Sequence, residues 1–144
     1  MSYTSEISKE YSLLSSEIDS LYHEACFKLG VSDSVMWILY TISQKGDSCS
    51  LRDIILLSGI SKQTINSALR KMEKENYIYL ENLDPRRKNV CLTQKGKELA
   101  SKSSIIIMQM EDDIFKSWSL EDSDLFIRLT KRYFEDLKLR VRRL

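Results

Sequence analysis

The stretch "SKQTINSALRKM", Ser61 to Met72, decides the fold, because a helix built from it would have two contrasting sides. Apolar residues recur three and four positions apart and would share one buried stripe: Ile65, Ala68, Leu69 and Met72. The other side carries hydrogen-bonding groups and no acid before Glu73: Lys62, Gln63, Thr64, Asn66, Ser67 and Arg70. Ordinary solvated helix faces mix Glu with Lys. This side therefore favours a negatively charged partner.

The residues before this stretch predict a shorter helix joined to it by a tight turn. Ser50 with Asp53 three positions later is a capping-box pattern, and the helix that it opens would end near Leu57. A turn at residues 58–60 contains Gly59, and Ser61 can cap the next helix. Two short helices joined by a turn of this kind indicate a helix-turn-helix.

After Met72 the periodicity changes from that of a helix to that of strands. In "YIYLENL", residues 77–83, Ile78 and Leu80 alternate with Tyr77 and Tyr79. "NVCLT", residues 89–93, alternates in the same way, and "DPRRK" between the two has proline at a turn position. These segments predict a hairpin with a basic tip, which is the wing of a winged helix.

Helices account for most of the remaining chain, since only one proline and four glycines interrupt it. We expect helices over residues 5–29 and 33–43, the second capped by Ser32, followed by a loop over residues 44–49. Thr93 can cap a long helix to about Lys116, and Ser119 with Asp122 opens a last helix. The predicted fold is mostly α (α+β), a winged helix-turn-helix with long N- and C-terminal helices.

Charge is distributed unevenly along the 144 residues, although the formal net charge is only +1. Residues 62–102 hold ten basic and five acidic side chains, whereas residues 1–30 have a net charge of −3. A basic middle beside an acidic start is typical of a polyanion-binding patch within a soluble protein.

The chain reads as a cytoplasmic protein with no membrane association. It begins without a signal-peptide pattern, and its most apolar run, "VMWILYTI" at residues 35–42, is too short to span a bilayer. Three widely spaced cysteines, Cys26, Cys49 and Cys91, are typical of reduced thiols rather than a disulfide framework.

Double-stranded DNA is the polyanion that this arrangement predicts. The second helix of a helix-turn-helix enters the major groove, where Gln and Asn can bind adenine, Lys can bind guanine and the Thr methyl group can contact thymine. Arg70 is better placed for a phosphate. At the wing tip we expect Arg86, Arg87 and Lys88 to contact the minor groove or backbone, with Asp84 pairing with Arg86 and fixing its direction.

These residues resemble the MarR family of bacterial transcription regulators over nearly the whole chain. The most specific part is "DPRRKNVCLTQKG", in which Asp84, Arg86 and then the Leu-Thr-x-x-Gly pattern of residues 92–96 match the family. "LSGISKQTINSALRKMEKENYI" also resembles the family's recognition helix and first wing strand. Asn76 stands where the family usually has glycine, and asparagine tolerates the left-handed conformation.

The resemblance implies a homodimeric regulator, expected to be a repressor, that binds a pseudo-palindromic operator. Residues 1–31 and 117–144 would then form the helical dimerisation region, and residues 32–116 the DNA-binding region. A wide apolar face on the last helix agrees with this expectation: Leu125, Phe126, Leu129, Tyr133, Phe134, Leu137, Val141 and Leu144.

The resemblance also implies that a small-molecule effector releases the DNA. A pocket for it between the long helices and the DNA-binding region could be lined by Tyr22, Trp37, Tyr40 and Met108. Each of these side chains has core packing as its alternative role. We predict no metal and no cofactor, because the single histidine, His23, has only Cys26 as a neighbouring ligand on its helical face.

Three alternatives remain beside the DNA-binding regulator. The winged helix could bind another protein instead of DNA. Cys26 could sense oxidants, although core packing is its default role and nothing in the nearby sequence lowers its pKa. A cysteine-based enzyme would need a base, and only His23 is available, without a nucleophile-elbow motif beside any cysteine. We therefore predict that the protein is not an enzyme.

Overall fold

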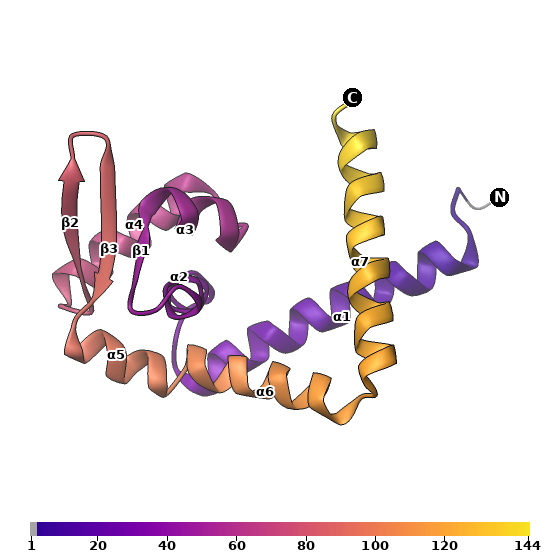
Figure 1. Ribbon diagram of the computed structural model, residues 1–144, viewed down its shortest axis with the longest axis horizontal. Coiled ribbons are helices and arrows are strands. Elements are labelled where there is room, and N and C mark those ends of the chain that lie inside the picture. Colours follow the sequence, from indigo (N-terminus) through magenta and orange to yellow (C-terminus); the bar gives the residue numbers. More distant parts are fainter. Residues whose placement is uncertain (1–2) are drawn as a thin grey trace. The chain divides into compact units, whose positions relative to one another are not determined.

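The computed structural model of the protein describes residues 3–144. Along these residues the elements are α1 (Glu6–Leu29), α2 (Asp33–Gln44), β1 (Ser48–Ser50), α3 (Leu51–Ser58), α4 (Lys62–Lys74), β2 (Ile78–Asp84), β3 (Arg87–Leu92), α5 (Gln94–Ser101), α6 (Ser104–Ser117) and α7 (Leu120–Val141). The predicted winged helix-turn-helix is confirmed, with α3 and α4 as its two helices and the β2–β3 hairpin as its wing (Figure 1). The chain divides into two compact units after Ile107.

The core of the first unit is built around α2, which contacts α3, α4, α5 and β1. Ile38, Leu39 and Ile42 of α2 are fully buried there, together with Ile54 of α3. The apolar stripe of α4 closes the same core, as predicted: Ile65, Ala68, Leu69 and Met72. Burial of one stripe fixes the rotation of α4, so its opposite side must face outward.

Helix starts follow the predicted caps. The side chains of Ser32, Ser50, Ser61, Thr93 and Ser119 each accept a hydrogen bond from the backbone N–H three residues later. Each bond satisfies one of the N–H groups that a helix leaves without an internal partner. The local sequence therefore determines where most of the helices begin.

The sheet is antiparallel, with strand order β1-β3-β2. Its edge strand β1 was not predicted, because residues 44–49 were expected to form a loop. Cys49 of β1 lies opposite Val90, and Ser50 lies opposite Asn89 before capping α3. Three residues are too few for an alternating pattern to be recognised in a sequence.

Both wing strands reach further toward the tip than predicted, so their connection is shorter. β2 continues to Asp84 and β3 begins at Arg87, which leaves only Pro85 and Arg86 in the turn. Asn82 pairs with Lys88 and Asp84 pairs with Arg87, so the pairing shifts around Leu83. A bulge of this kind re-aims the side chain of the extra residue.

The corner between α4 and β2 is hydrogen-bonded to the start of α5. Asn76 has a φ of 64°, the left-handed conformation that was expected from its substitution for glycine. The Thr93 hydroxyl donates to the Asn76 carbonyl at 2.6 Å and accepts from the Gly96 N–H at 3.0 Å. A Cβ atom on Gly96 would overlap the Tyr77 carbonyl oxygen. The Thr-x-x-Gly segment therefore permits close contact between α5 and the wing.

The single long helix predicted from Thr93 to about Lys116 is wrong, since α5 ends at Ser101 and α6 begins at Ser104. Serine hydroxyls at this break bond to carbonyls of the preceding turn: Ser101 to Glu98 at 2.7 Å and Ser103 to Leu99 at 2.6 Å. Bonds of this kind compete with the backbone ladder and bend helices.

The second unit contains the rest of α6 and the whole of α7. An aromatic cluster joins the two helices, with ring centroids 5.3 Å apart between Phe115 and Trp118 and 5.5 Å between Trp118 and Phe126. No residue of α7 is buried within the described part of the chain. Its predicted apolar stripe is therefore exposed, and Leu129 has 51% of its surface accessible.

The N-terminal helix α1 also exposes a series of large apolar side chains, including Ile7, Tyr11, Leu14 and Ile18. Within residues 3–144, no single helix has the length and apolar composition needed to cross a membrane; α1 and α2 meet those requirements only as a pair, and they are bent by 92°.

Candidate nucleic-acid interface

The polar side of α4 is accessible, as its sequence predicts. Lys62, Gln63, Thr64, Ser67 and Arg70 are exposed on it, and Asn66 is half-buried. The first turn of α4 contains no acid, and its N-terminal N–H groups add positive potential at this end. This end of the helix therefore suits the negative potential of a DNA groove.

The wing tip is organised by Asp84, but its partner is Arg87 and not Arg86, so this detail of the prediction is wrong. Asp84 Oδ2 accepts from Arg87 Nε at 2.6 Å, while Asp84 Oδ1 accepts from the backbone N–H groups of Arg86 and Arg87 at 2.8 and 2.9 Å. The two-residue turn places Arg86 at the tip, where its backbone rather than its guanidinium reaches the carboxylate.

Electrostatics agree with this geometry. The hydrogen bond from Arg87, followed by that from the Arg86 N–H, holds the pKa of the Asp84 carboxyl below its usual value. The carboxylate therefore stays ionised at neutral pH. Within residues 3–144, Arg86 and Lys88 take part in no side-chain ion pair, so their charges are available to a ligand.

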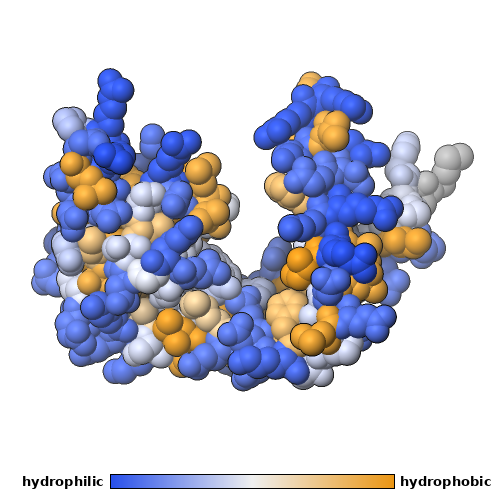
Figure 2. Space-filling view, viewed as in Figure 1, coloured by the Kyte–Doolittle hydropathy of each residue, from blue (hydrophilic) through white to orange (hydrophobic). Residues whose placement is uncertain are grey.

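The start of α4 and the wing tip line one groove, which we call the wing groove. Its volume is about 790 Å³, and its lining includes Lys62 together with Arg86, Arg87 and Lys88. Figure 2 shows hydrophilic side chains at the end of the first unit where Figure 1 places the tip of the hairpin. The two predicted parts of the interface, helix and wing, thus share one surface.

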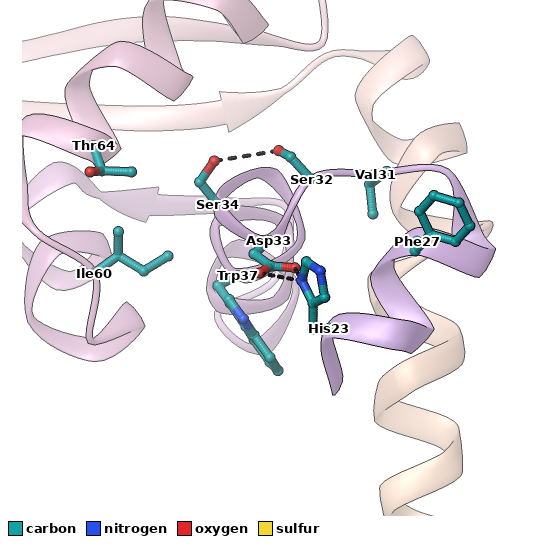
Figure 3. A pocket seen from close by; sticks show the side chains of 9 residues that line it. All are labelled: His23, Phe27, Val31, Ser32, Asp33, Ser34, Trp37, Ile60 and Thr64. Atoms are coloured by element: carbon teal, nitrogen blue, oxygen red, sulfur yellow. Dashed lines mark hydrogen bonds and ion pairs between the residues drawn. The ribbon is translucent and has the colours of Figure 1, made fainter. Parts of the chain in front are cut away.

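A second groove of about 630 Å³ lies beside α4, and we call it the α1–α2 groove. Its walls are His23, Phe27, Val31, Ser32, Asp33, Ser34, Trp37, Ile60 and Thr64. In Figure 3, Ile60 and Thr64 face it from one side, with Phe27 and Val31 on the other. His23 Nδ1 lies 2.8 Å from Asp33 Oδ2 and so connects α1 with the start of α2. Thr64 belongs to both the predicted DNA-contacting face and this groove.

Only part of the predicted effector pocket coincides with this groove. Tyr22, Trp37 and Tyr40 form an edge-to-face series with centroid distances of 5.4 and 5.2 Å, and Trp37 alone lines the groove. Met108 belongs to the second unit. Sequence reasoning missed Phe27 and Ile60, because they come from segments without a shared period. The sequence also did not indicate that His23 would line a groove for an effector.

Cys26 is inaccessible, with 2% of its surface exposed. Burial raises its pKa to about 11, and the neighbouring Asp33 carboxylate adds to the shift. The protonated thiol is the unreactive form, which disfavours both a nucleophile and an oxidant sensor. Cys26 instead packs against Met36 and Ile107 in a small apolar cluster. No group of three or more potential metal ligands occurs among residues 3–144.

Comparison with known proteins agrees with this geometry. The model of the MarR family matches residues 29–88, a segment that contains the helix-turn-helix and the wing tip. A search of curated proteins found no match. The helix-turn-helix and the wing tip of this chain are therefore similar to the MarR family, in agreement with the resemblance inferred from the sequence.

Solved structures of this fold cover both units. AbsC of Streptomyces coelicolor, a MarR family transcriptional regulator, has a TM-score of 0.73 at 19% identity, covering 96% of this chain and 99% of its own. MepR of S. aureus in complex with DNA has a TM-score of 0.67 at 22% identity, with coverages of 95% and 98%. BpsR of Bordetella bronchiseptica, whose DNA binding is regulated by 6-hydroxynicotinic acid, has a TM-score of 0.65 at 15% identity, with coverages of 86% and 98%.

Proposed function

We propose that the protein is a homodimeric, sequence-specific DNA-binding regulator of transcription, acting as a repressor in the bacterial cytoplasm. In this proposal α4 enters the major groove, and its side chains from Lys62 to Arg70 contact bases and phosphates. The wing places Arg86, Arg87 and Lys88 on the adjacent minor groove or backbone.

One observation carries the proposal: Lys62, at the start of α4, and the three cations of the wing line a single groove. A protein that reads sequence with a helix and grips the backbone with a hairpin needs both elements on one surface. The same surface contains polar side chains that suit base edges. These side chains would add sequence specificity to the electrostatic part of DNA binding.

The dimer would be formed by the helices that expose apolar faces in a single chain. α7 buries none of its side chains within the described residues, and the N-terminal part of α1 exposes Ile7, Tyr11 and Leu14. Burial of such faces is the main source of stability in dimers of this size. Two-fold symmetry would place the two recognition helices about 34 Å apart, one turn of DNA.

An effector would act through the α1–α2 groove. Phe27 and Trp37 supply apolar contacts for a small planar molecule, and the His23–Asp33 pair supplies polar ones. Because Ile60 and Thr64 belong to the helix-turn-helix, an occupant would contact α4 and shift its position or mobility. The regulation of BpsR by 6-hydroxynicotinic acid agrees with this role.

Selection of bound sequences from random double-stranded DNA tests the proposal, followed by fluorescence anisotropy with the selected duplex. The wild-type protein should select an inverted repeat and bind it with a steep salt dependence. Gln63→Ala and Asn66→Ala should relax base preference at particular positions, because each removes a side chain suited to adenine.

Uniform weakening at every base in these variants would contradict direct readout. Failure of the wild-type protein to select or bind any DNA would favour the alternative, a winged helix that binds another protein. In that case, replacing the wing cations would leave the partner's affinity unchanged.

A further inference from the structure

The wing groove contains a cation that belongs neither to the recognition helix nor to the wing. Arg52 lies in the first turn of α3, and its side chain lines this groove together with those of Lys62 and the wing tip. α3 reaches this position because Ser50 ends β1 opposite Asn89 of the wing strand and then caps α3. The sheet therefore holds the start of α3 beside the wing.

The charges of this groove have one sign. Five of its lining residues are basic and none is acidic: Arg52, Lys62, Arg86, Arg87 and Lys88. Within residues 3–144, only Arg87 among these five is held in an ion pair, by Asp84. A groove with several unneutralised cations and no carboxylate attracts an anion along its whole length.

Apolar side chains complete the groove, and two of them are exposed far more than a core residue. Leu56 of α3 has 65% of its surface accessible, and Leu83 of β2 has 53%. Leu83 is the bulged residue, with Asn82 and Asp84 paired on either side of it. Leu83 and Leu56 of α3 both line the groove.

We propose that this groove holds the sugar–phosphate backbone of one DNA strand, with Arg52 as a phosphate-binding residue. The strand would lie between the major-groove segment entered by α4 and the minor groove reached by the wing. Phosphates would meet Arg52 and Lys62, and deoxyribose carbons would pack on Leu56 and Leu83. A sugar–phosphate chain alternates anionic and apolar groups, which matches a cationic groove with exposed leucines.

This inference rests on the proposed function, because it assigns a further contact to the same DNA-binding surface. It adds a third point of attachment from α3, outside both predicted parts of the interface. Since Arg52 faces phosphate rather than a base, it contributes affinity without sequence preference.

The test compares Arg52→Gln with the wild-type protein on the duplex that the wild type selects, over a series of salt concentrations. Loss of one phosphate contact per subunit should lower the log–log salt slope by about 1.8 for the dimer. The ratio of the wild-type DNA affinity to that of Arg52→Gln should then fall roughly twelvefold between 50 and 200 mM salt. Base preference should stay unchanged.

Two further variants keep the result interpretable. Arg52→Lys retains the charge and should restore most of the slope. Lys102→Gln removes an exposed cation at the end of α5, outside the wing groove, and should bind as the wild type does. Circular dichroism melting of all three variants checks that none has lost its fold.

A neutral methylphosphonate placed at each phosphate of the duplex identifies the contact. At one position, the methylphosphonate should lower the DNA affinity of the wild-type protein. The same substitution should cause no further loss of affinity in Arg52→Gln. An unchanged salt slope in Arg52→Gln, while Arg86→Gln still lowers it, would overturn the inference and leave the proposed function intact. Absence of DNA binding by the wild-type protein would instead overturn the proposed function.

Discussion

Asp84 holds the side chain of Arg87 and the backbone of Arg86 through a single carboxylate, with all three donor–acceptor distances between 2.6 and 2.9 Å. One arginine is thereby used to shape the wing, and the guanidinium of the other is left for a ligand. The two arginines are adjacent in sequence and both exposed, yet the turn gives them different roles.

Asp84→Ala should loosen the wing tip and lower DNA affinity by an amount comparable with that of Arg86→Ala. The reason is that three hydrogen bonds orient the turn from this one side chain. The fold should survive, with a melting midpoint within about 3 °C of the wild type, because the site is exposed. Anisotropy with the selected duplex measures the affinity, and Asp124→Ala, which removes an exposed ion pair of α7, is the matched control. Wild-type affinity in Asp84→Ala would show that the tip needs no such support.

Wing geometry should depend on pH only in strongly acidic solution. The folded state lowers the pKa of Asp84 through Arg87 first and the Arg86 N–H second, relative to about 3.9 in an unfolded chain. Its stabilising contribution is therefore complete above pH ~3.9 and is lost as the pH falls through the lower folded pKa. The NMR chemical shifts of the Arg86 and Arg87 amides should stay constant from pH 8 to 5. A titration midpoint above 4 for these amides would contradict the assigned contacts.

Arg86→Ala should weaken binding to all DNA sequences alike. If Arg86 meets one phosphate in each subunit, the log–log salt slope should fall by about 1.8. The selected duplex and an unrelated duplex of equal length provide the comparison. An unchanged slope would refute the phosphate contact, and a loss confined to one base position would instead indicate base readout.

Gly96→Ala should destabilise the first unit by about 1–3 kcal/mol, the usual cost of forcing a methyl group into a packed site. The added Cβ would overlap the Tyr77 carbonyl oxygen, which is backbone and cannot rotate away. Urea unfolding measures the free energy, with Glu98→Ala on the exposed side of the same helix as the control. Equal stability of the two variants would show that α5 can shift away from Tyr77.

Leu129→Glu should dissociate the proposed dimer. Glutamate in the apolar face of α7 would bury an unpaired charge in each of the two copies, which raises the dissociation constant by at least about 100-fold. Sedimentation equilibrium measures the constant, and Lys131→Glu, on the other side of the helix, is the control. An unchanged dimer in Leu129→Glu, or a monomeric wild type, would rule out α7 as the interface.

Those parts of the fold that depend on neighbours in sequence could be predicted. The α4 stripe, the serine and threonine caps and the alternation of Ile78 and Leu80 all follow from patterns within a few residues. Asn76 was also interpretable, because few residues adopt its left-handed conformation.

The failures arose where a side chain had more than one available partner. The choice of Arg87 over Arg86 depends on a two-residue turn, which in turn depends on the bulge at Leu83. The helix break followed from hydroxyl groups that bond backward along the chain, a choice that helical periodicity does not record.

Neither groove could be predicted from the sequence. The lining of the wing groove comes from β1, α3, α4 and the hairpin, and that of the α1–α2 groove from α1, α2, α4 and the turns that precede α2 and α4. Such sets share no spacing, so only the folded chain brings Arg52 or Phe27 to its site.

The three buried cysteines can be used to measure local unfolding of the protein. Cys26 lies where α1 meets α2, whereas Cys49 and Cys91 lie in the sheet that carries the wing, and all three are free thiols. A thiol reagent can reach each sulfur only when its surroundings unfold locally, so alkylation rates measure those openings separately. Ligands that tighten one region would slow alkylation in that region alone, so regional motion can be measured without introducing a cysteine into the chain.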